Sequence, residues 1–318
     1  MTVSAKCLIV QPIHQIGFEV LRRAGITPVL CPDPSPETVL RMIPGCSAVI
    51  TRDAGLNAEA IAAAGALRVI AVHGTGHDPV DKPAATAAGA VICTTPGANA
   101  RSVAELALGL ALALARRIPA ADQAVRGCTA GYRERECFTE LNGKTALIVG
   151  WGQIGRLVGA MFSSGLGMEI LAYSPRIANI RGARKVDDLC AGLARAHLVS
   201  LHTPLRVETA NMFDTEAFAA MRPGALLVNT ARAGLIDEAA LVYALERGVV
   251  AGAALDLFSP EAPTGPLSRD PRVILTPHLG GSTEEALART ARAAAKNVIT
   301  ALNGIQPDTA LSPKDYRA

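Results

Sequence analysis

The chain has 318 residues, of which 50% are hydrophobic and 19% are charged, and its formal net charge is +3. This apolar content excludes general disorder, and the nearly balanced charge argues against a dedicated nucleic-acid-binding protein. Because domains usually contain about 100–200 residues, the length predicts two domains.

The sequence contains no segment that predicts secretion or membrane insertion. The first residues lead directly into an apolar, strand-like segment, without the charged and apolar regions of a signal peptide. The longest apolar run, residues 106–115, is shorter than the ~20 residues that cross a bilayer. Seven scattered cysteines without a C-x-x-C pair are typical of a reducing compartment. We therefore expect a cytoplasmic protein with no metal site and no membrane partner.

Short β-rich segments alternate with helix-length segments along nearly the whole chain. The predicted strands are Cys7–Ile13, Thr27–Cys31, Ala48–Thr51, Leu67–Val72, Val91–Thr94, Ala146–Val149, Glu169–Tyr173, Leu198–His202, Ala225–Thr230, Gly252–Leu257 and Val273–Thr276. Several are continuous apolar runs, as expected of strands that are buried on both faces of a parallel sheet. The pattern predicts an α/β fold.

Two predicted helices mark the joints between domains. Ser102 and Glu105 fit a capping box that opens an apolar helix over 102–117, and a comparable helix is predicted over 282–303. If the first helix leaves a domain and the second returns to it, one domain is inserted in the other. We expect two Rossmann-like or flavodoxin-like doubly wound domains, a substrate domain at 1–99 plus 286–318 and a dinucleotide-binding domain at 100–285.

A glycine motif follows one predicted strand and opens a helix, in the order Gly150-Trp151-Gly152-Gln153-Ile154-Gly155. In such a motif the first glycine makes the tight turn, the second lets the backbone approach a pyrophosphate, and the third lets helix and strand pack closely. The amides at the helix N-terminus then face the phosphates. The strand and helix on either side favour a dinucleotide site over an ordinary glycine-rich turn.

The end of the next predicted strand indicates which dinucleotide is bound. An NAD site usually has Asp or Glu about 20 residues after the motif, where it accepts a hydrogen bond from the ribose 2′-hydroxyl. This chain has Ser174 and Arg176 there instead. A guanidinium matches a 2′-phosphate well, and no carboxylate repels that phosphate. We expect NADP to be preferred and NAD to be possible, unless Arg176 simply points to solvent.

Further segments make the chain resemble the D-isomer-specific 2-hydroxyacid dehydrogenases over nearly its whole length. These segments are GTGHD at 74–78, NARSVAE at 99–105, LHTPL at 201–205 with the later Thr209, NTARAGLIDE at 229–238, ALDLFSPE at 254–261 and LTPHLGG at 275–281. The combination is far more specific than any one of these segments alone.

The resemblance implies a catalytic set of Arg232, Glu261 and His278. A histidine gives or takes the substrate proton, a carboxylate on its other ring nitrogen favours the protonated form, and an arginine binds the substrate carboxylate. The implied substrate-binding residues are Arg52, Gly74, Thr75, Gly76, Arg232 and His278. The predicted cofactor-binding residues are Gly150, Gly152, Gln153, Ile154, Gly155, Ser174, Arg176, His202, Thr203, Pro204, Thr209, Thr230, Ala231, Asp256 and Gly280.

These features predict an NAD(P)-dependent 2-hydroxyacid dehydrogenase that reduces a small 2-oxo acid, with glyoxylate or hydroxypyruvate as the first expectation. The alternative enzyme is a 3-phosphoglycerate dehydrogenase, because Arg52 could contact a phosphate. A different class is a dinucleotide-sensing binding protein without turnover, against which the intact catalytic set argues. The apolar helix suggests a homodimer. His73 and His77 flank the substrate loop and either tune substrate choice or only pack.

Overall fold

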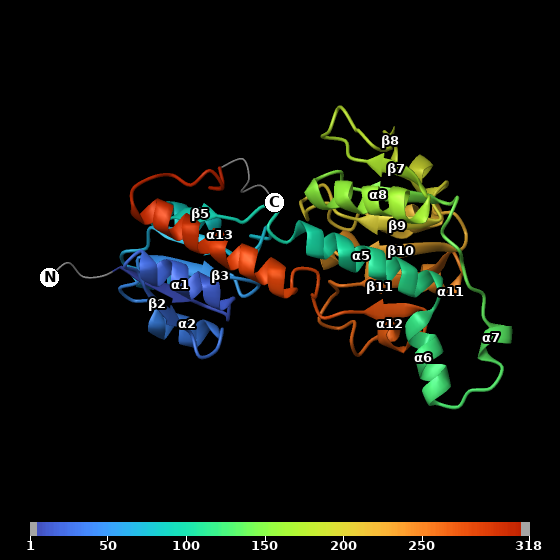
Figure 1. Ribbon diagram of the computed structural model, residues 1–318, viewed down its shortest axis with the longest axis horizontal. Coiled ribbons are helices and arrows are strands. Elements are labelled where there is room, and N and C mark those ends of the chain that lie inside the picture. The colour runs from blue at the N-terminus through green and yellow to red at the C-terminus, as the bar shows by residue number, and fades with distance from the viewer. Residues whose placement is uncertain (1–4, 313–318) are drawn as a thin grey trace. The chain divides into compact units, whose positions relative to one another are not determined.

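The computed structural model describes residues 5–312, which divide into two α/β units (Figure 1). The first unit comprises residues up to 99 and from 281 onward, and the second comprises residues 100–280. The ends of the predicted substrate domain, residues 1–4 and 313–318, lie outside the described residues. Each unit contains one parallel sheet, which confirms the predicted α/β class.

The sheet of the first unit has five parallel strands in the order β2-β1-β3-β4-β5. The strands are β1 (Lys6–Ile9), β2 (Thr27–Leu30), β3 (Ala48–Thr51), β4 (Val69–Val72) and β5 (Val91–Cys93). The helices are α1 (Gln15–Arg23), α2 (Pro36–Met42), α3 (Ala58–Ala64), α4 (Lys82–Ala87) and α13 (Glu284–Leu302). In this order the switch point, where the winding of the chain reverses, lies between β1 and β3.

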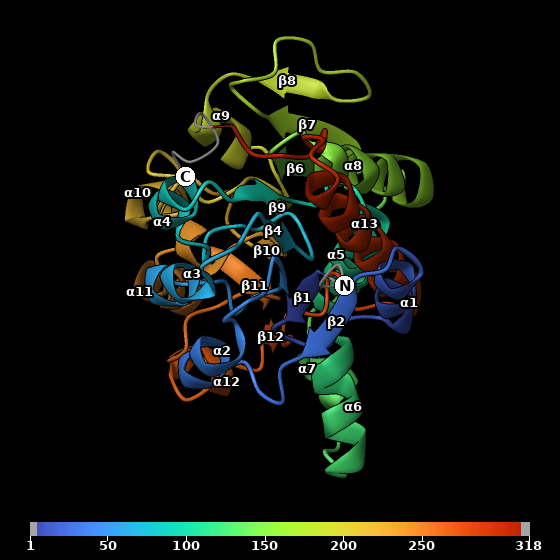
Figure 2. The ribbon, with the colours of Figure 1, turned by 90° about the vertical axis from the view of Figure 1, so that its left-hand side faces the viewer.

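Helices cover both faces of this sheet, as the second view of the first unit shows (Figure 2). Leu8 and Val49 pack on one face against residues of α2, α3 and α4. Their chain neighbours Cys7 and Ile50 pack on the other face against α1 and α13. Because both faces are buried, each strand needs apolar side chains at consecutive positions, which explains the continuous apolar runs.

The sheet of the second unit has seven parallel strands in the order β12-β11-β10-β9-β6-β7-β8. The strands are β6 (Thr145–Val149), β7 (Glu169–Tyr173), β8 (Arg184–Val186), β9 (Leu198–Leu201), β10 (Ala225–Asn229), β11 (Val250–Leu255) and β12 (Val273–Leu275). The helices are α5 (Ala100–Ala115), α6 (Ile118–Arg126), α7 (Tyr132–Arg135), α8 (Gln153–Leu166), α9 (Leu189–Leu193), α10 (Thr215–Ala219), α11 (Glu238–Glu246) and α12 (Pro266–Arg269), with a 3-10 turn η1 (Ala233–Leu235). Here the switch point lies between β6 and β9.

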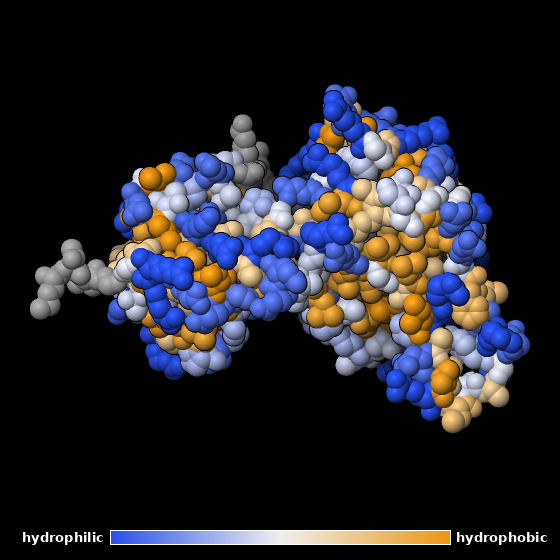
Figure 3. Space-filling model, viewed as in Figure 1, coloured by the Kyte–Doolittle hydropathy of each residue, from blue (hydrophilic) through white to orange (hydrophobic). Residues whose placement is uncertain are grey.

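The two faces of this second sheet also have separate cores. α5 and α8 pack on one face, and α9, α10 and α11 pack on the other. α6 and α7 follow α5 and extend away from the sheet (Figure 1). Apolar residues gather on the outer surface of the second unit around α5 (Figure 3), where Leu106, Leu108 and Leu112 are only partly buried.

Most of the predicted strands lie within a few residues of the observed ones. The largest difference is at the first strand, which was predicted over Cys7–Ile13 and ends at Ile9. Pro12 lacks the N–H that would continue the ladder. The prediction omits β8, a short strand at the edge of the sheet whose Arg184 and Lys185 interrupt the apolar pattern.

The capping box predicted at Ser102 and Glu105 is wrong. α5 begins at Ala100, so Ser102 lies inside the helix and its hydroxyl donates to the carbonyl of Gly280 at 2.6 Å. Glu105 instead accepts from Arg101 one helical turn earlier. A tertiary hydrogen bond has therefore replaced the local cap.

The second crossing between the units lies at residues 280 and 281, before the bound that we predicted at 285 and 286. The reason is that α13 belongs wholly to the first unit, and its N-cap, Thr283, accepts from the amide of Ala286. Within residues 5–312, every helix is too short or too polar to cross a bilayer.

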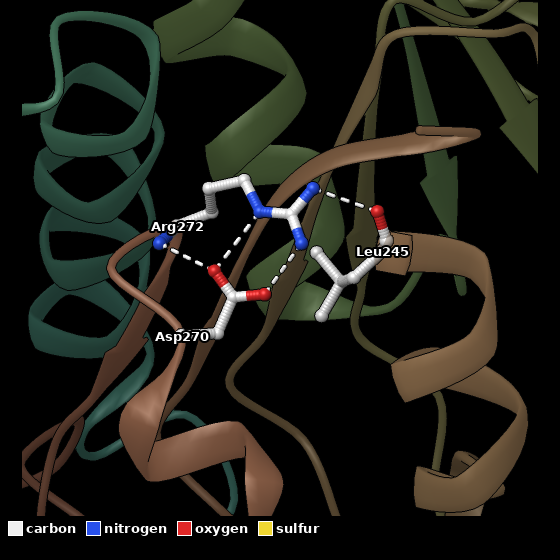
Figure 4. A network of polar contacts seen from close by, with 3 residues as sticks. All are labelled: Leu245, Asp270 and Arg272. Carbon is white, nitrogen blue, oxygen red and sulfur yellow. Dashed lines mark hydrogen bonds and ion pairs between the residues drawn. The ribbon is translucent and has the colours of Figure 1, made fainter. Parts of the chain in front are cut away.

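Arg272, just before β12, forms an ion pair with Asp270 and a hydrogen bond with the end of α11 (Figure 4). The backbone N–H and Nε of Arg272 each donate to Asp270 Oδ1 at 2.9 Å, and Nη2 donates to Oδ2 at 2.6 Å. Nη1 donates to the carbonyl of Leu245 in the last turn of α11 at 2.7 Å. These donations from Arg272 hold the pKa of Asp270 below its ordinary value.

We expect Asp270→Asn to destabilise the second unit by about 1.5–3 kcal/mol at neutral pH, because it removes a charged acceptor of several hydrogen bonds. Asp270 contributes this stability above its ordinary pKa of 3.8, and the contribution is lost as the pH falls through its lowered pKa. Urea unfolding at several pH values should therefore show a gap from the wild type that closes in acid. Asp122→Asn, which breaks the exposed pair with Arg126, is the control and should cost less than about 0.5 kcal/mol. An equal loss in both variants would contradict the assignment.

Candidate active site

The strands of the second unit end at one edge of the sheet. Six neighbouring strands end in register, so that their last residues pair across the sheet. In the order β7, β6, β9, β10, β11 and β12, these residues are Tyr173, Val149, Leu201, Asn229, Leu255 and Leu275. Because all of these strands are parallel, the segments that follow them lie along the same edge. In open α/β sheets this carboxyl edge is where ligands bind.

The glycine motif lies at the switch point of this sheet. Gly150 has φ +97°, and an added Cβ would lie 2.5 Å from the carbonyl oxygen of His202. A Cβ on Gly155 would lie 2.0 Å from the carbonyl oxygen of Gly150, whereas one on Gly152 would meet open space. Gly152 is the N-cap of α8, and no side chain caps that helix. Gln153 and Ile154 form its first turn. The motif therefore leaves the helix N-terminus open to an anion, as a dinucleotide pyrophosphate requires.

A pocket of about 390 Å³ opens beside this motif. Eight predicted cofactor residues line it: Gly150, Gly152, Ser174, Arg176, His202, Thr203, Pro204 and Thr209. Trp151, Arg206 and Glu208 line it as well, and the sequence interpretation did not assign them. The size and the mixture of apolar and convergent polar groups fit one end of a dinucleotide.

Three buried polar atoms at this edge have no hydrogen-bond partner. They are Trp151 Nε1, His202 Nδ1 and Thr230 Oγ1. His202 shares a 2.8 Å hydrogen bond with Ser200 through its other nitrogen, and loss of solvation around the ring lowers its pKa to about 3. His202 is therefore neutral at physiological pH. Unpaired buried polar atoms are costly, so their presence along this edge of the sheet fits a site that a polar ligand completes.

Asp256 holds the loop that carries His278. Its Oδ1 accepts from the Thr276 hydroxyl at 2.6 Å and from the Leu279 amide at 2.7 Å, and its Oδ2 accepts from the Gly280 amide at 2.8 Å. The Asp256 carbonyl also accepts from the His278 amide. His278 has φ +54°, a conformation that L-residues rarely adopt, and it is exposed at the edge of the sheet. The buried carboxylate of Asp256 thus stabilises an unusual backbone turn, which places the His278 side chain at the edge of the sheet.

The other two predicted catalytic residues follow the neighbouring strands. Arg232 comes after β10, where Asn229 Nδ2 donates to its carbonyl at 2.8 Å and Asn229 Oδ1 accepts from the Ala231 amide. Glu261 lies exposed in the loop between β11 and α12, and its carbonyl accepts from the Gly265 amide. The residues that carry Arg232, Glu261 and His278 therefore follow three adjacent strands, β10, β11 and β12.

The first unit has a basic group at its own switch point. Arg52 follows β3, and Gln11 follows β1 on the adjacent strand. Gln11 Oε1 accepts from the amides of Arg52 and Ala54 at 3.2 and 2.9 Å, and Arg52 Nη1 donates to the Pro12 carbonyl at 3.2 Å. That bond uses one of the five N–H donors of the guanidinium, so the group can still bind an anion.

The substrate loop follows the next strand, β4. His73 is 8% exposed and its Nε2 is buried without a hydrogen-bond partner. Burial, and then the charge of Arg52, lowers its pKa to about 4, so His73 is neutral at physiological pH. Gly74 has φ +152° and donates its amide to the Val72 carbonyl, while its own carbonyl accepts from Thr95. Thr75 and Gly76 follow at the edge of the sheet.

The comparison with known families identifies the class of protein. The D-isomer specific 2-hydroxyacid dehydrogenase, NAD binding domain, matches residues 108–280. This range coincides with most of the second unit, where the glycine motif and its pocket lie. The chain belongs to this family, which confirms the resemblance seen in the sequence.

Individual relatives agree with this assignment. The chain is 42% identical to the D-3-phosphoglycerate dehydrogenase of Mycobacterium tuberculosis over 279 residues, which are 85% of this chain and 52% of that protein. The chain thus spans about half the length of the curated relatives that it matches first. The structure of the TT0316 protein from Thermus thermophilus is similar with a TM-score of 0.89, 32% identity and coverage of 96% and 100%. A glyoxylate reductase from Paecilomyes thermophila gives 0.86, 29% identity and coverage of 98% and 99%.

Proposed function

We propose that the chain oxidises the 2-hydroxyl of a phosphorylated 2-hydroxy acid, D-3-phosphoglycerate, and reduces the corresponding 2-oxo acid in reverse. The observation that carries this choice is Arg52, a half-buried cation at the switch point of the first sheet. The comparisons favour the same alternative over the glyoxylate or hydroxypyruvate that we expected first, because the relatives at 42% identity are D-3-phosphoglycerate dehydrogenases.

Each end of such a substrate has a matching group. Arg52 supplies a planar donor for the phosphate. The amides of Thr75 and Gly76 are assigned to the carboxylate, because the amide of Gly74 already donates to Val72. Arg232 is assigned to the carboxylate and carbonyl as a two-pronged donor. The neutral His73 adds a polar atom beside Arg52 without competing for its charge.

The chemistry at the second unit rests on His278. In reduction its imidazolium donates the proton that the forming alkoxide needs, and in oxidation the neutral ring accepts it. Glu261 is assigned to the other ring nitrogen, where it favours the protonated form. The nicotinamide cofactor supplies or accepts the hydride when it is bound. Asp256 keeps the turn at 276–280 in place during both steps.

The cofactor is an NAD(P) dinucleotide, and we propose a preference for NADP. Ser174 stands where an acid would bind the NAD ribose, and Arg176 lies two residues further along the same pocket wall. A charge-assisted hydrogen bond from Arg176 to a 2′-phosphate contributes about 1.5–3 kcal/mol, which is roughly tenfold or more in affinity.

Two other functions have some support. Reduction of glyoxylate or hydroxypyruvate is supported by the likeness to the Paecilomyes thermophila glyoxylate reductase. A dinucleotide-sensing protein without turnover is less favoured, because Arg232, Glu261 and His278 are all present and follow strands of the same sheet that ends in the cofactor pocket.

We further propose that the protein is a homodimer and that its second copy covers α5 and α6. Apolar residues gather on the outer surface around α5 (Figure 3), and Ile118 and Val125 of α6 are 54% and 79% exposed. Monomers rarely expose contiguous apolar surface of this kind.

The catalytic assignment predicts the behaviour of His278→Asn. The variant should fold and bind cofactor normally, but its turnover should fall by about 10²–10⁴-fold, which is the usual contribution of general acid–base catalysis. Steady-state oxidation of D-3-phosphoglycerate and reduction of glyoxylate, each with NADP(H) and NAD(H), measure this loss. A wild-type chain without turnover on either substrate would favour the sensing function, and near-normal turnover in the variant would contradict the role of His278.

The phosphate assignment predicts the behaviour of Arg52→Gln. We expect KM for D-3-phosphoglycerate to rise about tenfold to a hundredfold, because a charge-assisted bond of about 1.5–3 kcal/mol is lost. The kcat/KM for glyoxylate, which has no phosphate, should change less than about threefold. Arg41→Gln, an exposed arginine on α2, is the control. An equal loss of kcat/KM on both substrates would show that Arg52 does not bind the phosphate.

The dimer predicts a concentration-dependent mass of twice 32.9 kDa in light scattering after gel filtration. Val125→Glu places a charge on the proposed interface without disturbing a core, because Val125 is already exposed. We expect this variant to dissociate at higher concentration than the wild type does. Ile305→Glu, on an exposed residue of the first unit, should not. A monomeric wild type would end this proposal.

A further inference from the structure

Arg176 has a partner in the cofactor pocket. Glu208 Oε1 lies 3.7 Å from Arg176 Nη2, and both side chains line the pocket beside the glycine motif. The two side chains are 62% and 68% exposed, so solvent reaches the pair and either side chain can move. The group that we assign to a 2′-phosphate is therefore already bound to an anion supplied by the chain itself.

Short backbone turns place both residues. The amide of Ile177 donates to the Ser174 carbonyl at 3.0 Å, which closes the turn that carries Arg176. On the other side, the Thr209 hydroxyl donates to the Pro204 carbonyl and accepts from the Arg206 amide, each at 2.8 Å. Glu208 lies between these anchored residues, so the backbone places its side chain within reach of Arg176.

We propose that Glu208 is a specificity-determining residue of the cofactor site. Its carboxylate competes with a 2′-phosphate for the guanidinium of Arg176, so it restrains the preference for NADP that Ser174 and Arg176 create. NAD has no 2′-phosphate and does not need that guanidinium, so its binding is little affected. This inference rests on the proposed preference for NADP and explains how such a site still accepts NAD.

The competition is measured with adenosine fragments, which bind without any hydride transfer. The ratio of the dissociation constants of 5′-AMP and 2′,5′-ADP, from titration calorimetry, isolates the contribution of the 2′-phosphate. We expect Glu208→Gln to raise this ratio about fivefold, because an exposed ion pair of this kind amounts to a several-fold change in equilibrium. NADPH and NADH should show the same change in quenching of Trp151, the single tryptophan of the chain, which is 3% exposed and lines the same pocket.

A second pair of variants tests whether the effect of Glu208→Gln depends on the guanidinium of Arg176. With Arg176→Gln already present, Glu208→Gln should change the ratio by less than about twofold, because the guanidinium that it would release is gone. Glu19→Gln is the matched control: its pair with Arg23 is also exposed, at 3.6 Å, and lies in the first unit. It should leave the ratio unchanged.

The outcomes separate this inference from the proposed preference. An unchanged or lower ratio in Glu208→Gln overturns the inference, and so does an equal gain with and without Arg176. A wild-type ratio that favours 5′-AMP, or a ratio that Ser174→Asp does not lower, contradicts the proposed preference for NADP instead. Because the two results come from different variants, either can fail alone.

Discussion

The site depends on parallel strands that end in register. In the second unit, β7, β6, β9, β10, β11 and β12 finish at the same edge, so residues far apart in the chain emerge side by side. The apolar cores on both faces fix the register of the strands, because a shift of one strand by a residue would expose buried side chains. The first unit repeats the principle with β1, β3 and β4, which bring Gln11, Arg52 and His73 to their own edge. The packing of the apolar side chains on both faces of each sheet therefore fixes the positions of the polar residues at its edge.

The backbone supplies as much of the site as the side chains do. Gly150 approaches His202 so closely that no side chain would fit, and this contact positions the helix N-terminus beside the pocket. The buried carboxylate of Asp256 accepts hydrogen bonds from two amides and a hydroxyl. The resulting turn holds His278 at a positive φ. A histidine in that conformation is unfavourable on its own, so the surrounding bonds must offset the cost.

The sequence predicts the parts of the fold that are governed by local pattern. Ala48–Thr51 and Glu169–Tyr173 are predicted with their observed bounds, because a buried strand needs an unbroken apolar run. Ser102 is mispredicted because its hydroxyl bonds a carbonyl far along the chain, which a local capping rule does not consider. Glu208 is absent from the predicted site for a similar reason. The usual rule looks for an acid at the end of the second strand, whereas this acid comes from the loop after β9.

The discontinuous first unit has a consequence for the order of synthesis. α13 is the last helix within residues 5–312, yet its Ala294, Ala295 and Val298 cover a face of the sheet that contains Cys7 and Ile50. During translation that face has only α1 to shield it until residues 284–302 have emerged, whereas the inserted unit can close as soon as its own strands are complete. The nascent chain therefore carries an exposed apolar sheet while residues 100–280 are synthesised, and a chaperone that binds extended apolar surface would find it there.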